Sequence, residues 1–333
     1  MTHGIFNRSE NRLQAFSLWM ACVALMFLTL SVPCCAQQVK ELPKDHGITG
    51  KQPEIYWHDA DISLDLDAST KDWSVVVQRG SNPAERAPLP DLLEQVYAIH
   101  RAAPNHAVLL ADLSAGAKFV GVIGLSPAKM LDSFWSSADP SLSPNNRYVL
   151  FVRFYPKHGA DNYDDQYRLY DVLGTRASNW PNRPAQDGPP NMPANYDDTL
   201  AGVPVYPLKT GELGRENTNI EDGQVHQRAS QFIWAADSSK VVFADAQGGV
   251  ISLVVVSVPT VPGSKPQTMV YPLAGTENVC PGPSEAECNI FNVRSLAWDG
   301  ESIRAALMIR PNHAKAIEKD LTIPLSKFVP AGK

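Results

Sequence analysis

A short unit, a turn followed by an apolar strand, recurs along this chain. Its clearest copy is residues 141–151, SLSPNNRYVLF, and residues 233–243, IWAADSSKVVF, align with it without a gap. In both copies the turn contains Asn or Asp, which tolerate tight backbone geometry, and the strand is rich in apolar residues. A repeated unit constrains the fold more than local propensity does, so the repeat is the basis for predicting the architecture.

Two further copies extend the pattern. Residues 296–309, LAWDGESIRAALMI, keep the order of tryptophan, turn and strand, and residues 103–112, APNHAVLLAD, form a weaker copy. The four turns follow one another at intervals of 40, 92 and 62 residues (Asn105, Asn145, Asp237 and Asp299). Blades of a β-propeller take about 40–50 residues, so the interval of 92 contains either a divergent blade or a large insertion.

The physics of the unit favours an array of sheets. One sheet of apolar strands cannot bury both of its faces, whereas several sheets arranged radially cover one another. The 27 prolines also argue against a mainly helical chain, because proline interrupts helices. We therefore predict an all-β fold, a β-propeller-like array of antiparallel meander blades. The array is expected to be incomplete or irregular, with a proline-rich insertion at 179–207.

One local signal disagrees with this prediction. Asp91 and Glu94 have the spacing of a capping box, and the apolar residues that follow fit a helix over 92–102. A helix there would create a βαβ module over 63–125, joined to a small β-domain. The alternative is a meander in which QVYAIHRA, HAVLLADL and KFVGVIGL are consecutive strands. The conformation of 92–102 distinguishes the two.

The N-terminus has the features of an export signal. Arg8 and Arg12 precede the apolar run 16–32, and the small residues that follow predict cleavage after Ala36. An apolar run of 17 residues is barely enough to cross a bilayer, so an N-terminal membrane anchor is the alternative. Lipidation of one of the two cysteines before Ala36 is a further alternative.

The leader sets the expected domain organisation and compartment. We expect a signal peptide over 1–36, a polar lead-in over 37–52 and a propeller-like domain over 53–333. The protein is then periplasmic or secreted, with no stable membrane span after cleavage. The net charge of −6, without a long basic run, argues against nucleic acid as a partner.

Cysteine usage agrees with export. Three of the five cysteines lie in the leader, and the remaining two, Cys280 and Cys288, enclose the short loop CPGPSEAEC. Two cysteines that close a Pro/Gly-rich loop in an oxidising compartment indicate a disulfide. A zinc site would need more ligands at closer spacing.

The repeat also resembles those of a known class of proteins. Ser-Pro-Asn-Asn before a Val-rich strand is similar to the repeats of TolB-like propellers and of dipeptidyl-peptidase-IV-type propellers. The similarity is strongest over 141–172, SLSPNNRYVLFVRFYPKHGADNYDDQYRLYDV, and the resemblance implies a propeller over roughly 96–325. Those peptidases also carry a hydrolase domain with a G-x-S-x-G elbow. In this chain GLSPA at 124–128 lacks the second glycine, so the peptidase activity does not carry over.

The insertion at 179–207 is the best candidate for a binding loop. It contains seven prolines, and an irregular loop of this length in a compact domain is usually functional or disordered. Its aromatic residues have no place in the repeat that would explain them by core packing, and two acidic residues follow the second aromatic. The candidate binding residues are Trp180, Tyr196, Asp197 and Asp198.

Two acidic clusters are candidate cation sites. The first is HDADISLDLD, with Asp59, Asp61, Asp65 and Asp67, and the second is DNYDDQY, with Asp161, Asp164 and Asp165. Neither has the glycine and terminal glutamate of a calcium loop, so a solvated strand face and a solvated hairpin tip are preferred. The histidines show no H-E-x-x-H spacing. We predict no metal, no cofactor and no catalytic residue.

Two functional hypotheses remain. The first is an exported, non-catalytic binding or scaffold protein of the cell envelope, whose partner is a protein, a peptide or a glycan. The second is a carbohydrate-active hydrolase or lyase in which carboxylates from different blades converge in a central funnel. The sequence favours the first, because it contains no local catalytic signature.

Overall fold

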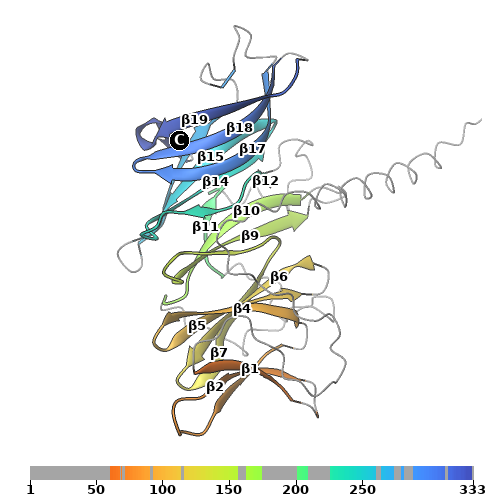
Figure 1. Cartoon of the computed structure of the whole chain (residues 1–333), viewed down its shortest axis with the longest axis vertical. Coiled ribbons are helices and arrows are strands. Elements are labelled where there is room, and N and C mark those ends of the chain that lie inside the picture. The colour runs from red at the N-terminus through yellow and green to blue at the C-terminus, as the bar shows by residue number, and fades with distance from the viewer. Residues whose placement is uncertain are drawn as a thin grey trace, which may run out of the picture. The chain divides into compact units, whose positions relative to one another are not determined.

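The computed structural model describes residues 61–67, 69, 72–90, 93–113, 116–156, 163–174, 201–208, 226–259, 264–273, 279–280, 288–311 and 314–331. Apart from a single 3-10 turn at Leu325–Lys327 (η4), every regular element in these ranges is a β-strand (Figure 1). The predicted all-β class is confirmed. Within the same ranges, no helix combines the length and the apolar character that crossing a membrane requires.

The strands of the described ranges form five antiparallel sheets (Figure 1). The first contains β1 (Ile62–Leu66), β2 (Trp73–Val77) and β3 (Glu85–Pro88), and the second contains β4 (Leu93–Ala103), β5 (His106–Leu113), β6 (Lys118–Leu125) and β7 (Ala128–Ser136). The third contains β8 (Ser141–Leu142), β9 (Tyr148–Pro156), β10 (Tyr163–Asp171) and β11 (Val203–Tyr206). The fourth contains β12 (Gln227–Arg228), β13 (Ile233–Trp234), β14 (Lys240–Gln247), β15 (Val250–Ser257), β16 (Gln267–Pro272) and β20 (Val329–Pro330). The fifth contains β17 (Cys288–Asp299), β18 (Ser302–Pro311) and β19 (Ile317–Pro324).

The segment that carried the helical signal is a strand. β4 covers Leu93–Ala103 and pairs with β5 along its length, so the alternative of a helix over 92–102 is wrong. The ladder also buries Ile99 opposite Leu109, and this burial outweighs a local capping pattern. The second sheet is the predicted meander, with its strands in chain order.

The two clearest copies of the repeat have the same backbone geometry. Asn146 and Ser238, which align in the sequence, both adopt positive φ, at 56° and 63°. The N–H of Asn146 donates to the carbonyl of Ser143 at 2.8 Å, and the N–H of Ser238 donates to the carbonyl of Ala235 at 2.9 Å. The alignment without a gap therefore describes a real structural repeat.

All four copies close in the same way. In each, a residue at the end of the third strand of the unit, or directly after it, donates its backbone N–H to a carbonyl in the turn that precedes the second strand. The four bonds are Leu125 to Asn105, Val172 to Arg147, Val258 to Ser239 and Leu325 to Glu301, at 2.9, 2.9, 2.8 and 2.9 Å. The copy at 103–112, the weakest in sequence, thus follows the same pattern as the others.

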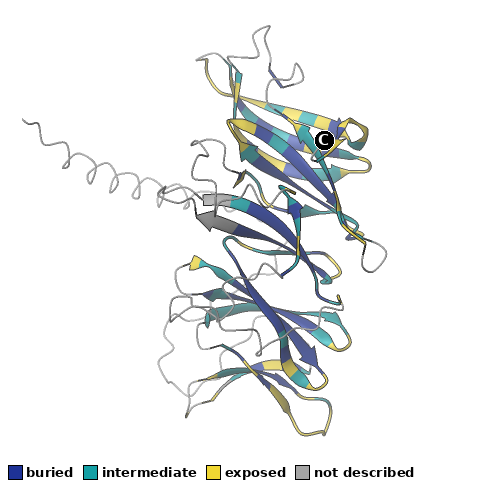
Figure 2. Cartoon of the chain, turned by 180° about the vertical axis from the view of Figure 1, so that it is seen from behind, coloured by how far each residue is buried: buried dark blue, intermediate teal, exposed yellow. Residues whose placement is uncertain are grey.

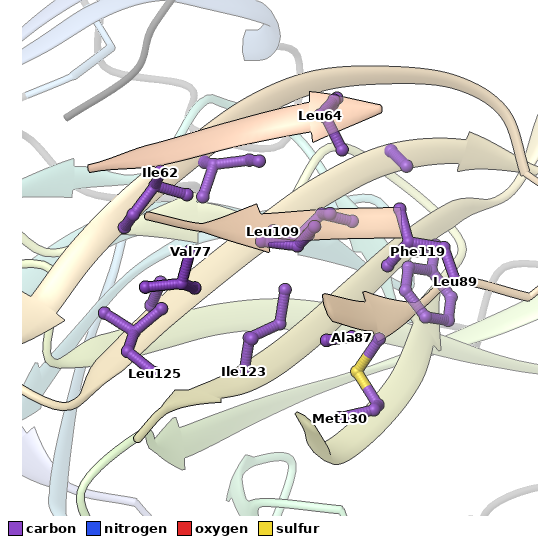
Figure 3. Packing of buried hydrophobic residues seen from close by; sticks show 14 of the residues in the cluster. Ile62, Leu64, Val77, Ala87, Leu89, Leu109, Phe119, Ile123, Leu125 and Met130 are labelled. Carbon is purple, nitrogen blue, oxygen red and sulfur yellow. The ribbon is translucent and has the colours of Figure 1, made fainter. Parts of the chain in front are cut away.

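The central strands of the second, third and fourth sheets, such as β5 and β14, are buried on both faces (Figure 2). Side chains alternate between the faces of a strand, so consecutive residues belong to different cores. On β5, Leu109 packs toward the first sheet and Val108 toward the third; on β14, Phe243 packs toward the third sheet and Val242 toward the fifth. Each pair of successive sheets therefore shares a hydrophobic core. Figure 3 shows the core between the first and second sheets, in which Ile62, Val77 and Leu109 are labelled.

The tryptophans of the repeat connect neighbouring sheets. The indole N–H of Trp234 donates to the Ser141 hydroxyl at 3.1 Å, and that of Trp298 donates to the Ile233 carbonyl at 2.9 Å. Ser141 and Ile233 are equivalent positions of the repeat, 92 residues apart. Each tryptophan therefore bonds to the same position of the preceding sheet.

The described parts of the 92-residue interval belong to the third and fourth sheets. This assignment favours an insertion over a divergent blade between the two copies. The predicted leader, the lead-in and residues 179–200 of the insertion lie outside the described residues.

Two phenylalanines provide a matched test of the two-sided core. Phe243 is fully buried, with its ring 4.3 Å from that of Tyr167 and 5.3 Å from that of Phe232. Phe243→Ala should lower the free energy of unfolding in urea by about 3–5 kcal/mol. Phe291 is 45% exposed, beside Arg310, so Phe291→Ala should cost about 1 kcal/mol or less. Equal losses in the two variants would contradict the assigned core.

Candidate functional site

The four predicted binding residues, Trp180, Tyr196, Asp197 and Asp198, lie outside the described residues. The described part of the insertion, 201–207, is its C-terminal end and contains β11, the last strand of the third sheet, so the predicted irregular segment is a strand at 203–206. The candidate site therefore consists of the contacts that hold this end in place. The contacts come mainly from β10, the neighbouring strand.

A buried arginine holds the backbone where the insertion returns to the sheet. Arg168, on β10, donates from Nε to the carbonyl of Ala201 at 2.8 Å and from one terminal nitrogen to the carbonyl of Gly202 at 3.0 Å. Its other terminal nitrogen donates to Oε1 of Gln166 at 2.7 Å. A guanidinium presents these donors in a rigid planar fork, so the carbonyls are held in one geometry.

Gly202 is required at this position. Its φ is +63°, and a Cβ there would lie 2.8 Å from the carbonyl oxygen of Leu169. Only glycine combines the positive φ with such a close approach of two backbones. The return of the insertion is thus defined both by the arginine and by this contact.

β11 is also bonded to the fourth sheet. The hydroxyl of Thr268, on β16, donates to the carbonyl of Val205 at 2.7 Å, and the Val205 side chain is buried. Tyr206 pairs with Tyr167 of β10, and their rings stack with centroids 6.3 Å apart. The described end of the insertion therefore has a fixed position against two sheets.

A buried polar network lies beside this end. Nδ1 of His226 lies 2.7 Å from one carboxylate oxygen of Asp245, and the hydroxyl of Tyr167 donates to the other oxygen at 2.7 Å. All three side chains are buried, and the ring of Tyr206 meets the imidazole edge-on at 5.2 Å. The network joins β10 and β11 of the third sheet to β14 of the fourth.

Burial sets the protonation of this network. Burial raises the pKa of Asp245, while the hydrogen bonds from His226 and Tyr167 oppose the rise. Burial, followed by the charge of Asp245, also raises the pKa of Tyr206 to about 12 and that of Tyr167 well above its ordinary value. Both phenols therefore stay protonated near neutral pH.

A carboxylate that orients an imidazole is also found where histidine acts as a general base. Here the carboxylate of Asp245 is bonded to Tyr167 on β10 and to His226 just before β12, and the three side chains are buried. These hydrogen bonds and the surrounding packing explain the network as a structural, polar link between the third and fourth sheets. Sequence reasoning missed this link; the signal that could have found it is Asp245, a charged residue within the otherwise apolar segment VVFADA.

The acidic clusters are used in local and inter-strand contacts. Asp61 pairs with Arg101 at 2.5 Å, Asp65 pairs with Arg86 at 2.5 Å, and Asp67 accepts from the Ser69 hydroxyl at 2.5 Å. In the second cluster, Asp165 accepts the backbone N–H of Arg228 at 2.9 Å. Among the described residues, no group of three or more His, Cys, Asp or Glu side chains is placed to hold a metal ion. Asp59, Asp161 and the side chain of Asp164 lie outside that part of the chain.

The predicted disulfide is present. Cys280 is bonded to Cys288, with Cα atoms 5.7 Å apart, and Cys288 is the first residue of β17. Val279, next to the bridge, is buried in the core between the fourth and fifth sheets. The bridge thus closes its loop at the start of the fifth sheet.

Comparison with known proteins adds little to this description. No protein-family model and no curated protein matches the chain. Among solved structures, there is a weak similarity to a candidate 6-phosphogluconolactonase from Bacteroides fragilis, which is 10% identical. The match covers 83% of this chain and 84% of that one, at a TM-score of 0.22. A score this low supports no argument about function.

The raised pKa of Asp245 predicts how stability depends on pH. An acid whose pKa is higher in the folded chain contributes stability below its unfolded pKa, near 3.8, and loses that contribution as pH rises through the folded value. The free energy of unfolding of the wild type, relative to Asp245→Asn, should therefore fall with rising pH over this interval. Urea unfolding of both proteins between about pH 3 and pH 7 measures the difference.

Asp237→Asn is the control with the opposite sign. The backbone and hydroxyl of Ser239 donate to the Asp237 carboxylate and lower its pKa. Its contribution to stability is present above the unfolded pKa and is lost as pH falls. Parallel trends in the two series would contradict the assignment of Asp245.

Proposed function

We propose that the protein is an exported, non-catalytic binding protein of the cell envelope, which contacts a protein, peptide or glycan through its proline-rich insertion. The observation that supports the proposal is the fixed return of the insertion into the third sheet. Arg168 and Thr268 define that return through three hydrogen bonds to backbone carbonyls, and Gly202 through its close approach to the backbone of Leu169. Binding segments are commonly loops that a rigid scaffold positions.

A fixed end lowers the entropic cost of binding. When one end of a loop is already ordered, less conformational freedom remains to be lost on association. Prolines within the loop restrict it further, since each fixes its own φ. Trp180 and Tyr196 would then supply the contact area, because tryptophan and tyrosine dominate binding energy at many interfaces.

Export is supported by the leader and by the disulfide. The N-terminal pattern of basic residues, apolar run and small residues is that of a signal peptide. Stable disulfides such as Cys280–Cys288 are typical of periplasmic and secreted proteins. The same two features favour the TolB-like propellers over intracellular propeller proteins as the class to which the repeat belongs.

The contacts of the carboxylates support the hydrolase alternative less well than the binding proposal. A glycosidase needs two carboxyl groups about 5–10 Å apart that face a substrate. Acidic residues of the described ranges form ion pairs within the protein. Asp171 pairs with Arg147 at 2.9 Å, and Asp112 pairs with Lys118 at 2.7 Å. Asp245 is covered and satisfied by two donors. These contacts favour binding over hydrolysis.

Replacement of the insertion tests the proposal. Residues 179–200 would be exchanged for an equally long Gly/Ser linker, which leaves Gly202 and β11 unchanged. Partners cross-linked to the exported chain in its native envelope would be identified by mass spectrometry. We expect a specific partner of the wild type to be lost, without a change in the urea midpoint. Capture of the same partner by both chains would contradict the proposal.

Single substitutions then locate the contact. Trp180→Ala and Tyr196→Ala should each weaken binding of the captured partner by about fivefold or more, since truncating an interface residue that contributes significantly costs more than about 1 kcal/mol. Phe291→Ala is the matched control, because it removes an exposed aromatic ring from the fifth sheet. Titration of the purified partner measures the three variants. Equal losses in all three would show that the insertion is not specifically involved.

A further inference from the structure

The fifth sheet differs from the three sheets before it. In the second, third and fourth sheets a further strand pairs with the third strand of the repeat: β7 with β6, β11 with β10 and β16 with β15. In the fifth sheet the third strand is β19, and within the described residues the sheet ends there (Figure 1). Among the strands of the described ranges, none occupies the position beside β19 that a fourth strand takes in the three sheets before it.

The chain after β19 does not occupy this position. It turns through η4, and its next strand, β20, pairs with β16 of the fourth sheet. The N–H of Ala331 also donates to the carbonyl of Thr268 at 2.9 Å. The segment that could have completed the fifth sheet therefore completes the edge of its neighbour.

The pairing of β19 with β18 shows which backbone groups face outward. Leu325 donates to Glu301, and hydrogen-bonded pairs in an antiparallel ladder recur every second residue. The backbone groups of Ile323, Leu321, Lys319 and Ile317 then face β18. Those of Glu318, Asp320 and Thr322 face outward. Pro324, which has no N–H, fits this pattern because it falls on the outward side.

Two of the three outward positions carry acidic side chains. Their charge determines which strand of a partner could pair favourably with β19. If two copies of the chain paired through Glu318, Asp320 and Thr322, the two-fold axis would place Asp320 opposite Asp320. A strand with Lys or Arg at alternate positions would instead form favourable cross-strand pairs. The existing contact of Glu318 with Arg294, at 3.3 Å, is exposed and therefore weak.

The other face of the edge is partly apolar. Leu321 packs against the core between the fourth and fifth sheets, and Ile317, 38% exposed, lies on the same face of β19 with Lys319 between them. An added strand would therefore present apolar side chains on this face and basic ones on the other. We propose that β19 binds an extended segment of a partner protein with this amphipathic, basic pattern, by strand addition to the fifth sheet.

A defined peptide probe tests the proposal. The probe is a labelled peptide of alternating Lys and Val, and its control alternates Lys and Pro, which has the same charge but cannot add to a sheet. Fluorescence anisotropy with the full exported chain should show binding of the first peptide only. Hydrogen exchange should show new protection at the amides of Glu318, Asp320 and Thr322.

Two variants separate strand addition from simple charge attraction. Asp320→Pro removes one outward N–H and leaves the ladder with β18 intact, so it should weaken binding by about tenfold. Asp320→Lys keeps the backbone and should weaken binding by about two- to fivefold through lost charge pairing. Glu301→Lys, an equal charge reversal at the exposed hairpin of the same sheet, where Glu301 pairs with Lys240, should have no comparable effect.

Three results would overturn the proposal. They are equal binding of the Lys-Pro peptide, protection of the three amides in the free chain, and dimerisation through β19 detected by sedimentation. Failure of this proposal is distinguishable from failure of the proposed function, because exchange of residues 179–200 leaves β19 unchanged. A partner lost on that exchange but insensitive to Asp320→Lys would locate binding at the insertion alone.

Discussion

Coverage of both strand faces is the constraint on which the rest of the structure depends. In the second, third and fourth sheets, consecutive residues of one strand belong to two different cores, as Val108 and Leu109 do on β5. No sheet in this part of the chain could be stable alone, because both of its apolar faces would be exposed to water. The sheets are therefore stabilised in sequence, each by the next.

Polar links are added where this packing alone would not fix the relative position of two sheets. The tryptophans of the repeat bond to the preceding sheet, and Tyr167, His226 and Asp245 form a buried network between the third and fourth sheets. Hydrogen bonds are directional, whereas apolar contacts are not, so these links favour one register. They also hold the place at which the insertion returns to the scaffold.

The regular pattern ends at the fifth sheet. Its inner face packs on the fourth sheet, while β17 and β19 have many exposed residues (Figure 2). The strand that follows it joins the fourth sheet instead. We therefore propose two distinct surfaces for association, the proline-rich insertion with its fixed C-terminal end and the edge strand β19 with its acidic residues.

The sequence by itself determined the all-β class, the four repeat turns and the disulfide, because turn chemistry, alternation of apolar residues and cysteine context are local signals. The tertiary structure decided what depends on distant partners. It made 92–102 a strand, since pairing with β5 outweighed a capping pattern. It also brought His226 and Asp245 together with Tyr167 and sent β20 to the fourth sheet, because residues far apart in the chain meet only when the sheets pack.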